Sequence, residues 1–363
     1  MKKLLFLFLL ITLAFSLAAC ELPLDFLNPE IPEGSGSDLP ENPENPKTPE
    51  DPEEPAAPVC EHEFVEIGRT EAKPLSDGVI ISKCGLCNEE KTEIHTPMTR
   101  QLKVLAIGNS FSVDAITYLW NICNNAGVTD LVIANAQIGG CSIDMHFSYM
   151  INKTPKYQYT KYTKKGSESE TDVKIDVALE DEDWDFIVTQ QLSQYAGKPS
   201  SFQYFDNLLE YIVNKCPEAE IYWHMTWAYQ EGITKSGYEY YNNDQMTMYN
   251  AIVETVQTTV LSRSVIKGVI PAGTAMQNLR TTPIGDNVTR DGYHADLGVG
   301  RFAISMTWYA IFTGGSLDLV NWYPGNYYNE VATNRAFIME SVENAIKTPY
   351  SVTQSQYVYS PTN

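Results

Sequence analysis

Basic residues are scarce in this chain. Its 363 residues include 25 lysines and arginines against 46 aspartates and glutamates, which gives a formal net charge of −21. A protein that binds the phosphate backbone needs a basic surface, so the composition argues against nucleic acid as a partner. Hydrophobic residues still make up 43% of the chain, enough for a sizeable core. The length predicts two domains with accessory segments.

Long hydrophobic runs are missing as well, except at the N-terminus. A basic start precedes a mostly apolar run over residues 4–19, which is shorter than the ~20 residues that span a bilayer. This pattern predicts a signal peptide over residues 1–19. The run ends in Leu-Ala-Ala-Cys at Cys20, which resembles the lipobox of bacterial lipoproteins. We therefore expect an exported bacterial lipoprotein, extracytoplasmic and anchored to the cell membrane by lipidated Cys20; an ordinary secretory signal or an uncleaved anchor is the alternative.

Residues 20–59 hold half of the prolines, ten of twenty. Proline recurs at every third residue from Pro40 to Pro58, which favours polyproline II. Eleven acidic residues against Lys47 alone keep the segment extended by self-repulsion. These features predict an acidic stalk between the membrane and the folded part.

Residues 60–97 are too few to bury much core, so such a module needs a metal or a disulfide. Short strands are expected over residues 63–67 and 78–83. Four soft ligands occur in the segment, and together they match a Cys3His zinc set in a zinc-ribbon-like module: Cys60, His62, Cys84 and Cys87. His95 is an alternative fourth ligand. Oxidation of two cysteines to a disulfide is the competing interpretation for an exported protein, and the odd number of thiols favours structural zinc.

Residues 100–350 alternate between apolar runs and helical patterns. Such alternation predicts an α/β domain, a three-layer α/β/α sandwich around a parallel sheet, with its active site at the carboxyl ends of the strands. A tail over residues 351–363 would follow. The expected strands cover residues 102–107, 131–134, 186–189, 221–225 and 265–270, and the expected helices cover residues 113–126, 202–214, 244–261, 298–312 and 334–346.

Histidine is rare, which narrows the search for a catalytic base. Of five histidines, two lie in the small module and His224 lies within an expected strand, which leaves His146 and His294. His294 follows Asp291 in an Asp-x-x-His turn, which can place a carboxylate beside an imidazole. Ser110 follows the first strand on a tight turn that opens a helix, where it is a candidate nucleophile or an ordinary helix cap.

Together these fragments resemble the SGNH, or GDSL-type, hydrolases, an esterase superfamily with a flavodoxin-like fold. More narrowly, the segments Ile-Gly-Asn-Ser-Phe-Ser, ending at Ser112, and Trp-Asp-Phe-Ile-Val-Thr-Gln-Gln, ending at Gln191, are similar to an SGNH-like domain family of bacterial lipoproteins. The resemblance implies Ser110 as nucleophile, His294 as base, Asp291 as the orienting acid and the Gly140 N–H as an oxyanion donor. It implies no cofactor for catalysis.

The chain departs from this superfamily at two positions. Asn109 replaces the usual aspartate after the first glycine, and the Gly-x-Asn-Asp block is missing. Gln191 is the expected substitute for the missing asparagine donor, with Gln190 and Gln194 as alternatives. The folded part also lacks the Gly-x-Ser-x-Gly motif of α/β-hydrolases.

The predicted function is that of a surface-anchored serine esterase. Abundant aromatic side chains suit sugar rings, which suggests O-acyl groups on a carbohydrate as substrate: Trp184, Tyr195, Trp223, Trp227, Tyr229 and the run 238–241. One alternative is a glycan-binding or adhesion lipoprotein with a weakened oxyanion hole. A cysteine nucleophile at Cys141 beside His146 and acyl transfer to a sugar are further alternatives.

Overall fold

The computed structural model describes residues 60–97, 99 and 101–357. The predicted signal peptide, the lipidation site Cys20 and the stalk lie outside these residues. None of the helices in the described ranges has the length and hydropathy needed to cross a bilayer.

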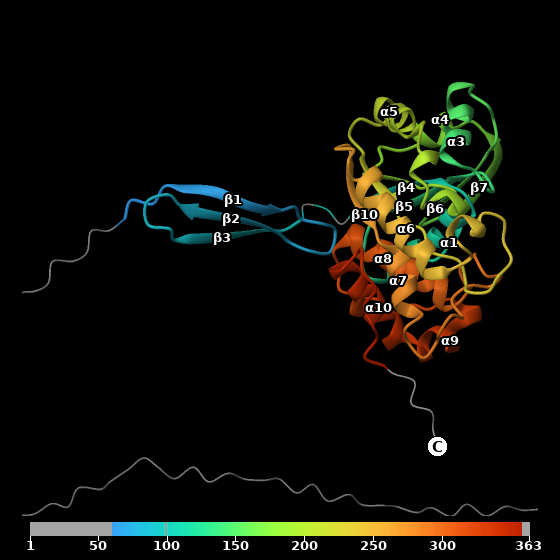
Figure 1. The fold of residues 1–363 in the computed structure, drawn as a ribbon. Helices are drawn as coiled ribbons and strands as arrows, with labels where there is room; N and C mark the ends of the chain where they lie inside the picture. Colours follow the sequence, from blue (N-terminus) through green and yellow to red (C-terminus); the bar gives the residue numbers. More distant parts are fainter. Residues whose placement is uncertain (1–59, 98, 100, 358–363) are drawn as a thin grey trace, which may run out of the picture. The chain divides into compact units, whose positions relative to one another are not determined.

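The small module is a three-stranded antiparallel sheet in the order β1-β2-β3 (Figure 1). Its strands are β1 (Phe64–Thr70), β2 (Gly78–Cys84) and β3 (Glu90–His95). The first two match the expected strands. The sequence analysis missed β3 because Ile94 is its only large apolar residue and gives no alternating pattern.

The large domain is built on a seven-stranded sheet in the order β10-β9-β8-β4-β5-β6-β7. Its five parallel strands follow the flavodoxin-like order, in which the first strand lies between the second and the third. They are β4 (Leu102–Gly108), β5 (Leu131–Gln137), β8 (Phe186–Thr189), β9 (Glu220–His224) and β10 (Ile266–Ile270). All five strands predicted from apolar runs are therefore confirmed within a few residues.

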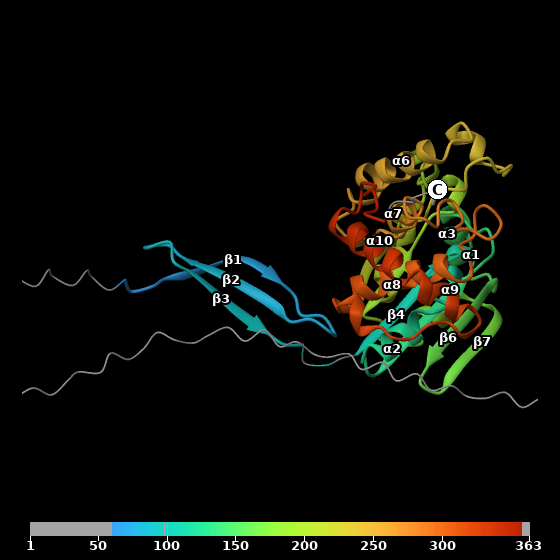
Figure 2. The same ribbon diagram turned by 90° about the horizontal axis from the view of Figure 1, so that it is seen from below.

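The predicted parallel sheet is extended at one edge by two antiparallel strands that the sequence analysis missed. Strands β6 (Tyr157–Thr163) and β7 (Gly166–Val173) form a hairpin that pairs antiparallel with β5. Figure 2 shows the hairpin at the outer end of the sheet. Because β7 is exposed along almost its whole length, it needs no apolar pattern, and its acidic side chains discourage pairing with a further strand.

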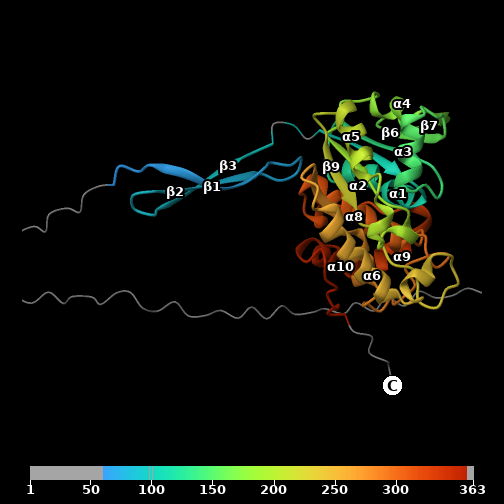
Figure 3. The same cartoon turned by 45° about the horizontal axis from the view of Figure 1, so that its top comes forward.

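Helices cover both faces of the parallel strands (Figure 3). One layer contains α3 (Ile143–Ile151), α4 (Ile175–Leu179) and α5 (Phe205–Lys215). The other contains α1 (Ser110–Ile116), α2 (Leu119–Asn125), α7 (Ala272–Leu279), α8 (Val299–Thr313) and α10 (Arg335–Lys347). Buried from both sides, β4 carries apolar residues at successive positions. Helices α6 (Gln245–Thr255) and α9 (Tyr328–Thr333) complete the domain.

Two predicted helices differ in detail from those observed. The helix expected over residues 113–126 is broken into α1 and α2, and it starts earlier because the Asn109 side chain caps α1 by accepting from the N–H of Phe111. The helix expected over residues 244–261 changes to a π-helical turn at Val256–Val260. Part of the expected tail packs on the domain, since the Thr353 N–H donates to Asn278 on α7.

Candidate functional site

A serine, a histidine and an aspartate form one chain of hydrogen bonds at the carboxyl edge of the sheet. Ser110 is the first residue of α1 and follows β4 directly, while Asp291 and His294 lie in the loop before α8. The Ser110 Oγ lies 2.8 Å from the Nε2 of His294, and the Nδ1 of His294 lies 2.6 Å from the Oδ2 of Asp291. The geometry is that of a nucleophile, a base and an orienting acid.

The loop around His294 is shaped by local contacts. The Oδ1 of Asp291 accepts from the N–H of His294 at 2.8 Å, and the N–H of Arg290 donates to the carbonyl of His294 at 3.1 Å. Gly292 has φ +87°, and a Cβ there would lie 2.5 Å from Ile233, so the turn requires glycine. An Asp-x-x-His turn thus fixes carboxylate and imidazole together.

The carboxylate of Asp291 is suited to face an imidazolium. Partial burial by itself raises the pKa of Asp291, but the hydrogen bonds from the His294 side chain and from the N–H groups of His294 and Tyr293 outweigh it and hold the pKa below its ordinary value. Since Asp291 accepts, the Nδ1 of His294 carries the proton, and its Nε2 is left to accept from the Ser110 hydroxyl.

Aromatic side chains hold the imidazole in place. The ring of His294 lies 4.1 Å from Tyr293 and 5.8 Å from Phe111, measured between centroids. Phe111 stacks on the fully buried Trp227 at 4.2 Å. The indole N–H of Trp227 in turn donates to the carbonyl of Tyr293 at 2.7 Å, which ties the loop after β9 to the Asp-x-x-His turn.

A buried ionic cluster joins the serine's helix to the histidine's loop. Asp114 lies one helical turn after Ser110, and its side chain has no exposed surface. It pairs with Arg290 at 3.0 Å and with Arg301 at 2.7 Å, and it accepts from the N–H of Ala295 at 3.0 Å. Sequence analysis missed this group, because nothing local to Asp114 indicates that two distant arginines reach it.

Asn109 connects the segments from which an oxyanion hole would be built. Its Nδ2 donates to the carbonyl of Cys141 at 3.0 Å, which holds the loop that contains Gly140. Its Oδ1 accepts from the N–H of Phe111 and, at 2.9 Å, from the amide of Gln190. Gly140 itself is exposed, has φ +65° and has open space around its Cα. An asparagine makes these contacts because it offers both a donor and an acceptor, unlike the superfamily's aspartate.

The oxyanion role predicted for Gln191 conflicts with its contacts. Its Nε2 donates to the carbonyl and the hydroxyl of Ser201 at 2.9 and 3.2 Å, and its Oε1 accepts from the N–H groups of Ile143 and Leu192. The whole amide is therefore used to hold loops together. Gln190, an alternative in the sequence analysis, is buried beside Asn109 and needs only one N–H for that contact.

The other histidines outside the module do not compete for the role of base. His224 is buried in β9, where its Nδ1 accepts from the indole of Trp308 at 3.0 Å, and burial lowers its pKa to about 3. His146 is buried against the hydroxyl of Tyr157 at 3.0 Å, and burial lowers its pKa to about 4. The Cys141 alternative also fails, because burial raises the pKa of that thiol to about 12 and keeps it protonated.

Most of the aromatic residues expected to bind sugar belong to the core instead. Exceptions are Tyr195, which is half-buried, and Tyr240, which is 46% exposed; their rings stack at 6.2 Å, and Lys198 lies 3.5 Å above the Tyr240 ring. Buried are Trp184, Trp223, Trp227, Tyr229, Tyr238 and Tyr241.

In the small module, the four predicted metal ligands converge. The ligand atoms of Cys60, His62, Cys84 and Cys87 all lie within 4.8 Å of one another. The alternative ligand His95 is engaged elsewhere, with its Nε2 at 3.2 Å from the carbonyl of Thr70.

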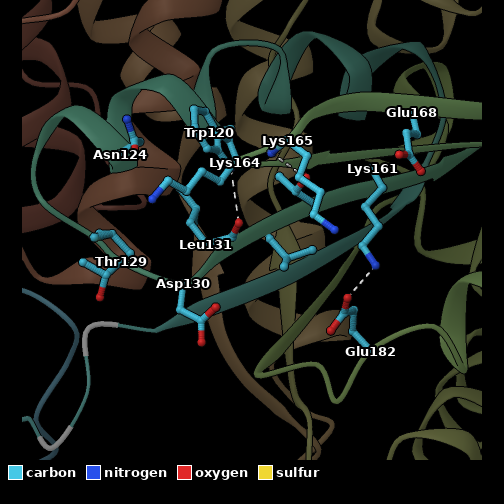
Figure 4. A pocket seen from close by; sticks show the side chains of 13 residues that line it. Trp120, Asn124, Thr129, Asp130, Leu131, Lys161, Lys164, Lys165, Glu168 and Glu182 are labelled. Carbon is cyan, nitrogen blue, oxygen red and sulfur yellow. Dashed lines mark hydrogen bonds and ion pairs between the residues drawn. The ribbon is translucent and has the colours of Figure 1, made fainter.

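A cavity of about 590 Å³ lies at the opposite edge of the large sheet, near the amino end of β5 (Figure 4). Its lining is mostly polar and charged, and Lys161 pairs there with Glu182. No serine, cysteine or histidine is among its lining residues, so it has no serine–histidine pair like that at the carboxyl edge, which remains the candidate active site.

Comparison with known proteins agrees with this fold. A family model described as "Domain of unknown function (DUF4886)" matches residues 103–337. The chain belongs to the DUF4886 family. A crystal structure of a DUF4886 family protein from Bacteroides uniformis ATCC 8492 is 37% identical, covers 70% of this chain and 98% of that one, and has a TM-score of 0.67. Among curated proteins, none matches this DUF4886 chain.

SGNH and GDSL-type hydrolases are also among its structural neighbours, at low identity. A putative SGNH hydrolase from Slackia heliotrinireducens is 16% identical, covers 59% of this chain and 100% of that one, and has a TM-score of 0.38. An acetyl xylan esterase, AlAXEase, is 18% identical, covers 58% of this chain and 100% of that one, and has a TM-score of 0.36. At such values the likeness assigns no activity to a DUF4886 protein, so function has to be argued from the site.

Proposed function

We propose that this DUF4886 protein is a serine esterase. One observation carries the proposal: the unbroken line of hydrogen bonds from the Ser110 hydroxyl through the imidazole of His294 to the carboxylate of Asp291. A protein that only binds ligands has no need of this aligned set. The activity belongs to the large domain, and its chemistry needs no cofactor.

In the proposed reaction, His294 Nε2 takes the hydroxyl proton while the Ser110 Oγ attacks the ester carbonyl. Asp291 holds the imidazole in the required tautomer and stabilises the imidazolium that forms. His294 then protonates the leaving alkoxide, which departs as the alcohol and leaves an acyl group on Ser110. Water, deprotonated by His294, attacks the acyl-enzyme and releases the acid.

Three donors would stabilise the oxyanion of the tetrahedral intermediate. They are the backbone N–H groups of Ser110 and Gly140 and the second amide N–H of Gln190. Asn109 supports this assignment, because it contacts both the Gly140 loop and Gln190. Gln190 takes the place predicted for Gln191, whose amide is committed to Ser201.

For the substrate, we propose O-acyl groups on a carbohydrate. Tyr195 and Tyr240 support this class, because they lie in the segments that follow β8 and β9, at the edge of the sheet that carries Ser110. Aromatic faces pack well against sugar rings. Acetylated polysaccharides are therefore the first natural substrates to assay.

The test compares p-nitrophenyl acetate hydrolysis by the full-length protein and by Ser110→Ala. Loss of the nucleophile of a triad lowers kcat by up to ~10⁶-fold, so the variant should fall to background while circular dichroism shows it folded. The wild type should also react with a fluorophosphonate probe. If the folded wild type neither hydrolyses the ester nor reacts with the probe, the esterase proposal fails and the glycan-binding alternative gains support.

Gln190 and Gln191 offer a matched pair for the oxyanion donor. Gln190→Ala should lower kcat by ~10²–10³-fold at nearly unchanged KM, the usual effect of losing one such donor. Gln191→Ala should instead lower stability, by ~1–3 kcal/mol, since it leaves buried N–H groups without acceptors. Steady-state kinetics and urea denaturation of both variants separate the two roles. A large loss of kcat in Gln191→Ala, with only a loss of stability in Gln190→Ala, would instead identify Gln191 as the oxyanion donor.

We also propose that lipidated Cys20 anchors the esterase to the membrane from outside the cytoplasm, with the acidic segment 21–59 as spacer. The support is the sequence of residues 1–20 alone. In cells, Cys20→Ser should move the protein from the membrane fraction to the soluble exported fraction. Intact mass spectrometry of the wild type should show acyl chains on an N-terminal cysteine.

A further inference from the structure

The small module lacks the core that would hold it together. Among residues 60–97, only Gly78 and Cys84 are buried, and Val65 and Ile94, which lie on its outer strands, are 62% and 70% exposed. A three-stranded sheet needs an apolar face packed against something to be stable in water. The cysteine and histidine group, whose four ligand atoms lie within 4.8 Å of one another, is a cluster that could help to fix β1, β2 and β3.

The spacing of the cluster fits a tetrahedral metal ion. Zinc bonds of ~2.3 Å to sulfur and ~2.0–2.1 Å to nitrogen place two sulfurs about 3.8 Å apart and a sulfur and a nitrogen about 3.5 Å apart. The sulfurs of Cys60 and Cys84 are separated by 3.8 Å, and the Cys87 sulfur lies 3.3 Å from the Nδ1 of His62. Cys60 and Cys84 are free thiols at this distance, not a disulfide.

The backbone around Cys84 is also arranged for a bound thiolate. The N–H of Leu86 points at the Cys84 sulfur at 3.4 Å, and the N–H of Asn88 donates to the carbonyl of Cys84 at 3.0 Å. Asn88 has φ +64°, which closes the tight turn that carries Cys87 back to the same point. An N–H aimed at sulfur stabilises the negative charge that a metal-bound cysteine carries.

His62 is oriented to act as the fourth ligand. Its Nδ1 faces the cluster, and its Nε2 lies 3.3 Å from the carboxylate of Glu89. A metal-bound histidine almost always donates its second ring N–H to a carboxylate or carbonyl, which fixes the tautomer. His62 and Glu89 are therefore arranged like a metal-binding histidine and the carboxylate that fixes its tautomer.

We propose that the module binds one zinc ion through the thiolates of Cys60, Cys84 and Cys87 and the Nδ1 of His62, with Glu89 as the positioning residue for that imidazole. Binding releases the three thiol protons to solvent and changes no oxidation state. Four protein ligands leave no open position, so the ion has a structural role. The inference is independent of the esterase activity, because no ligand belongs to the large domain.

Metal content of the full-length protein is the direct test. Protein purified under reducing conditions and dialysed against buffer without metal should retain about one zinc per chain. Cys87→Ser should lose it, and His95→Gln, whose ring faces Thr70, should keep it. Cobalt(II) exchanged for zinc should give the strong visible absorption of a tetrahedral thiolate site. Tryptophan fluorescence reports the folding of the large domain in every variant, because all six tryptophans lie in that domain.

Glu89 provides the finer test. Glu89→Gln should weaken zinc binding ~10–100-fold in a chelator competition, the usual effect of losing an outer partner. Glu90→Gln is the matched control, since Glu90 faces Lys83 at 3.8 Å, and it should bind like the wild type. Equal affinities for both variants would overturn the role of Glu89. Failure of the wild type to retain zinc, with a disulfide among its three cysteines, would overturn the metal site itself.

Discussion

The large domain and the small module reach a defined structure by different means. In the large domain, stability is spread over a continuous apolar core in which β4 is buried on both faces by two layers of helices. In the module, only Gly78 and Cys84 are buried, and the ligand atoms of three cysteines and a histidine lie within 4.8 Å of one another. A distributed core tolerates the loss of single contacts, whereas the proposed zinc site would depend on each of its four ligands.

Asp114 tests this contrast most strongly, because at this residue the large domain also depends on a few polar contacts. Asp114→Ala should lower the free energy of unfolding by ~3–5 kcal/mol, since Arg290 and Arg301 lose their buried counter-charge. Urea denaturation followed by tryptophan fluorescence measures this domain alone, because every tryptophan of the chain lies in it. A change below ~1 kcal/mol would show that the cluster contributes little to stability.

The same variant also tests how the triad is positioned. Without Asp114, α1 and the catalytic loop lose their shared anchor at Ala295, so kcat should fall while the protein is still folded. Thr258→Ala on the domain surface is a suitable control.

Truncating one aliphatic side chain in the large domain and one in the small module tests the contrast directly. Leu105 has no exposed surface at the centre of β4, and Ile81 is 37% exposed at the centre of β2. Leu105→Ala should lower the unfolding free energy of its domain by ~2–5 kcal/mol, whereas Ile81→Ala should change the stability of the module by less than ~1 kcal/mol. Amide hydrogen exchange of β2 reports the module. A large loss in Ile81→Ala would mean that the module has a core after all.

A small effect is expected at a surface ion pair of the large domain. Asp176 pairs with Lys153 at 2.6 Å and with Lys215 at 3.0 Å. Partial burial raises its pKa, but these lysines and the Tyr211 hydroxyl outweigh burial and lower the pKa to about 2. Because the folded state lowers the pKa, the contribution is complete above pH ~4 and is lost as the pH falls toward 2.

Asp176→Asn should therefore lower the free energy of unfolding by about 1 kcal/mol at neutral pH. Solvent screening makes this effect smaller than the full pKa shift would give. The difference from the wild type should shrink between pH 4 and pH 2 in urea denaturation curves. A pH-independent difference would assign the effect to packing instead of charge.

The apolar runs of the sequence were sufficient to predict the five parallel strands, because a strand buried on both faces must be apolar at successive positions. Asp291 and His294 were predictable because a four-residue turn determines their spacing. The convergence of Cys60, His62, Cys84 and Cys87 was predictable from residue type and spacing alone.

Other features depend on partners that are far apart in the chain. Strand β7 is exposed along almost its whole length and leaves no apolar pattern, and the break between α1 and α2 carries no proline or glycine. Gln190 and Gln191 are identical neighbours in sequence, so only Asn109 and Ser201, brought to them by folding, distinguish their roles. The sequence by itself thus determined the parallel strands, the Asp-x-x-His turn and the presence of three cysteines and a histidine in the module, because these depend on local pattern and residue type. The tertiary structure alone decided that Gln190 meets Asn109 and that Arg290 and Arg301 meet at Asp114, because those contacts join residues more than 80 positions apart.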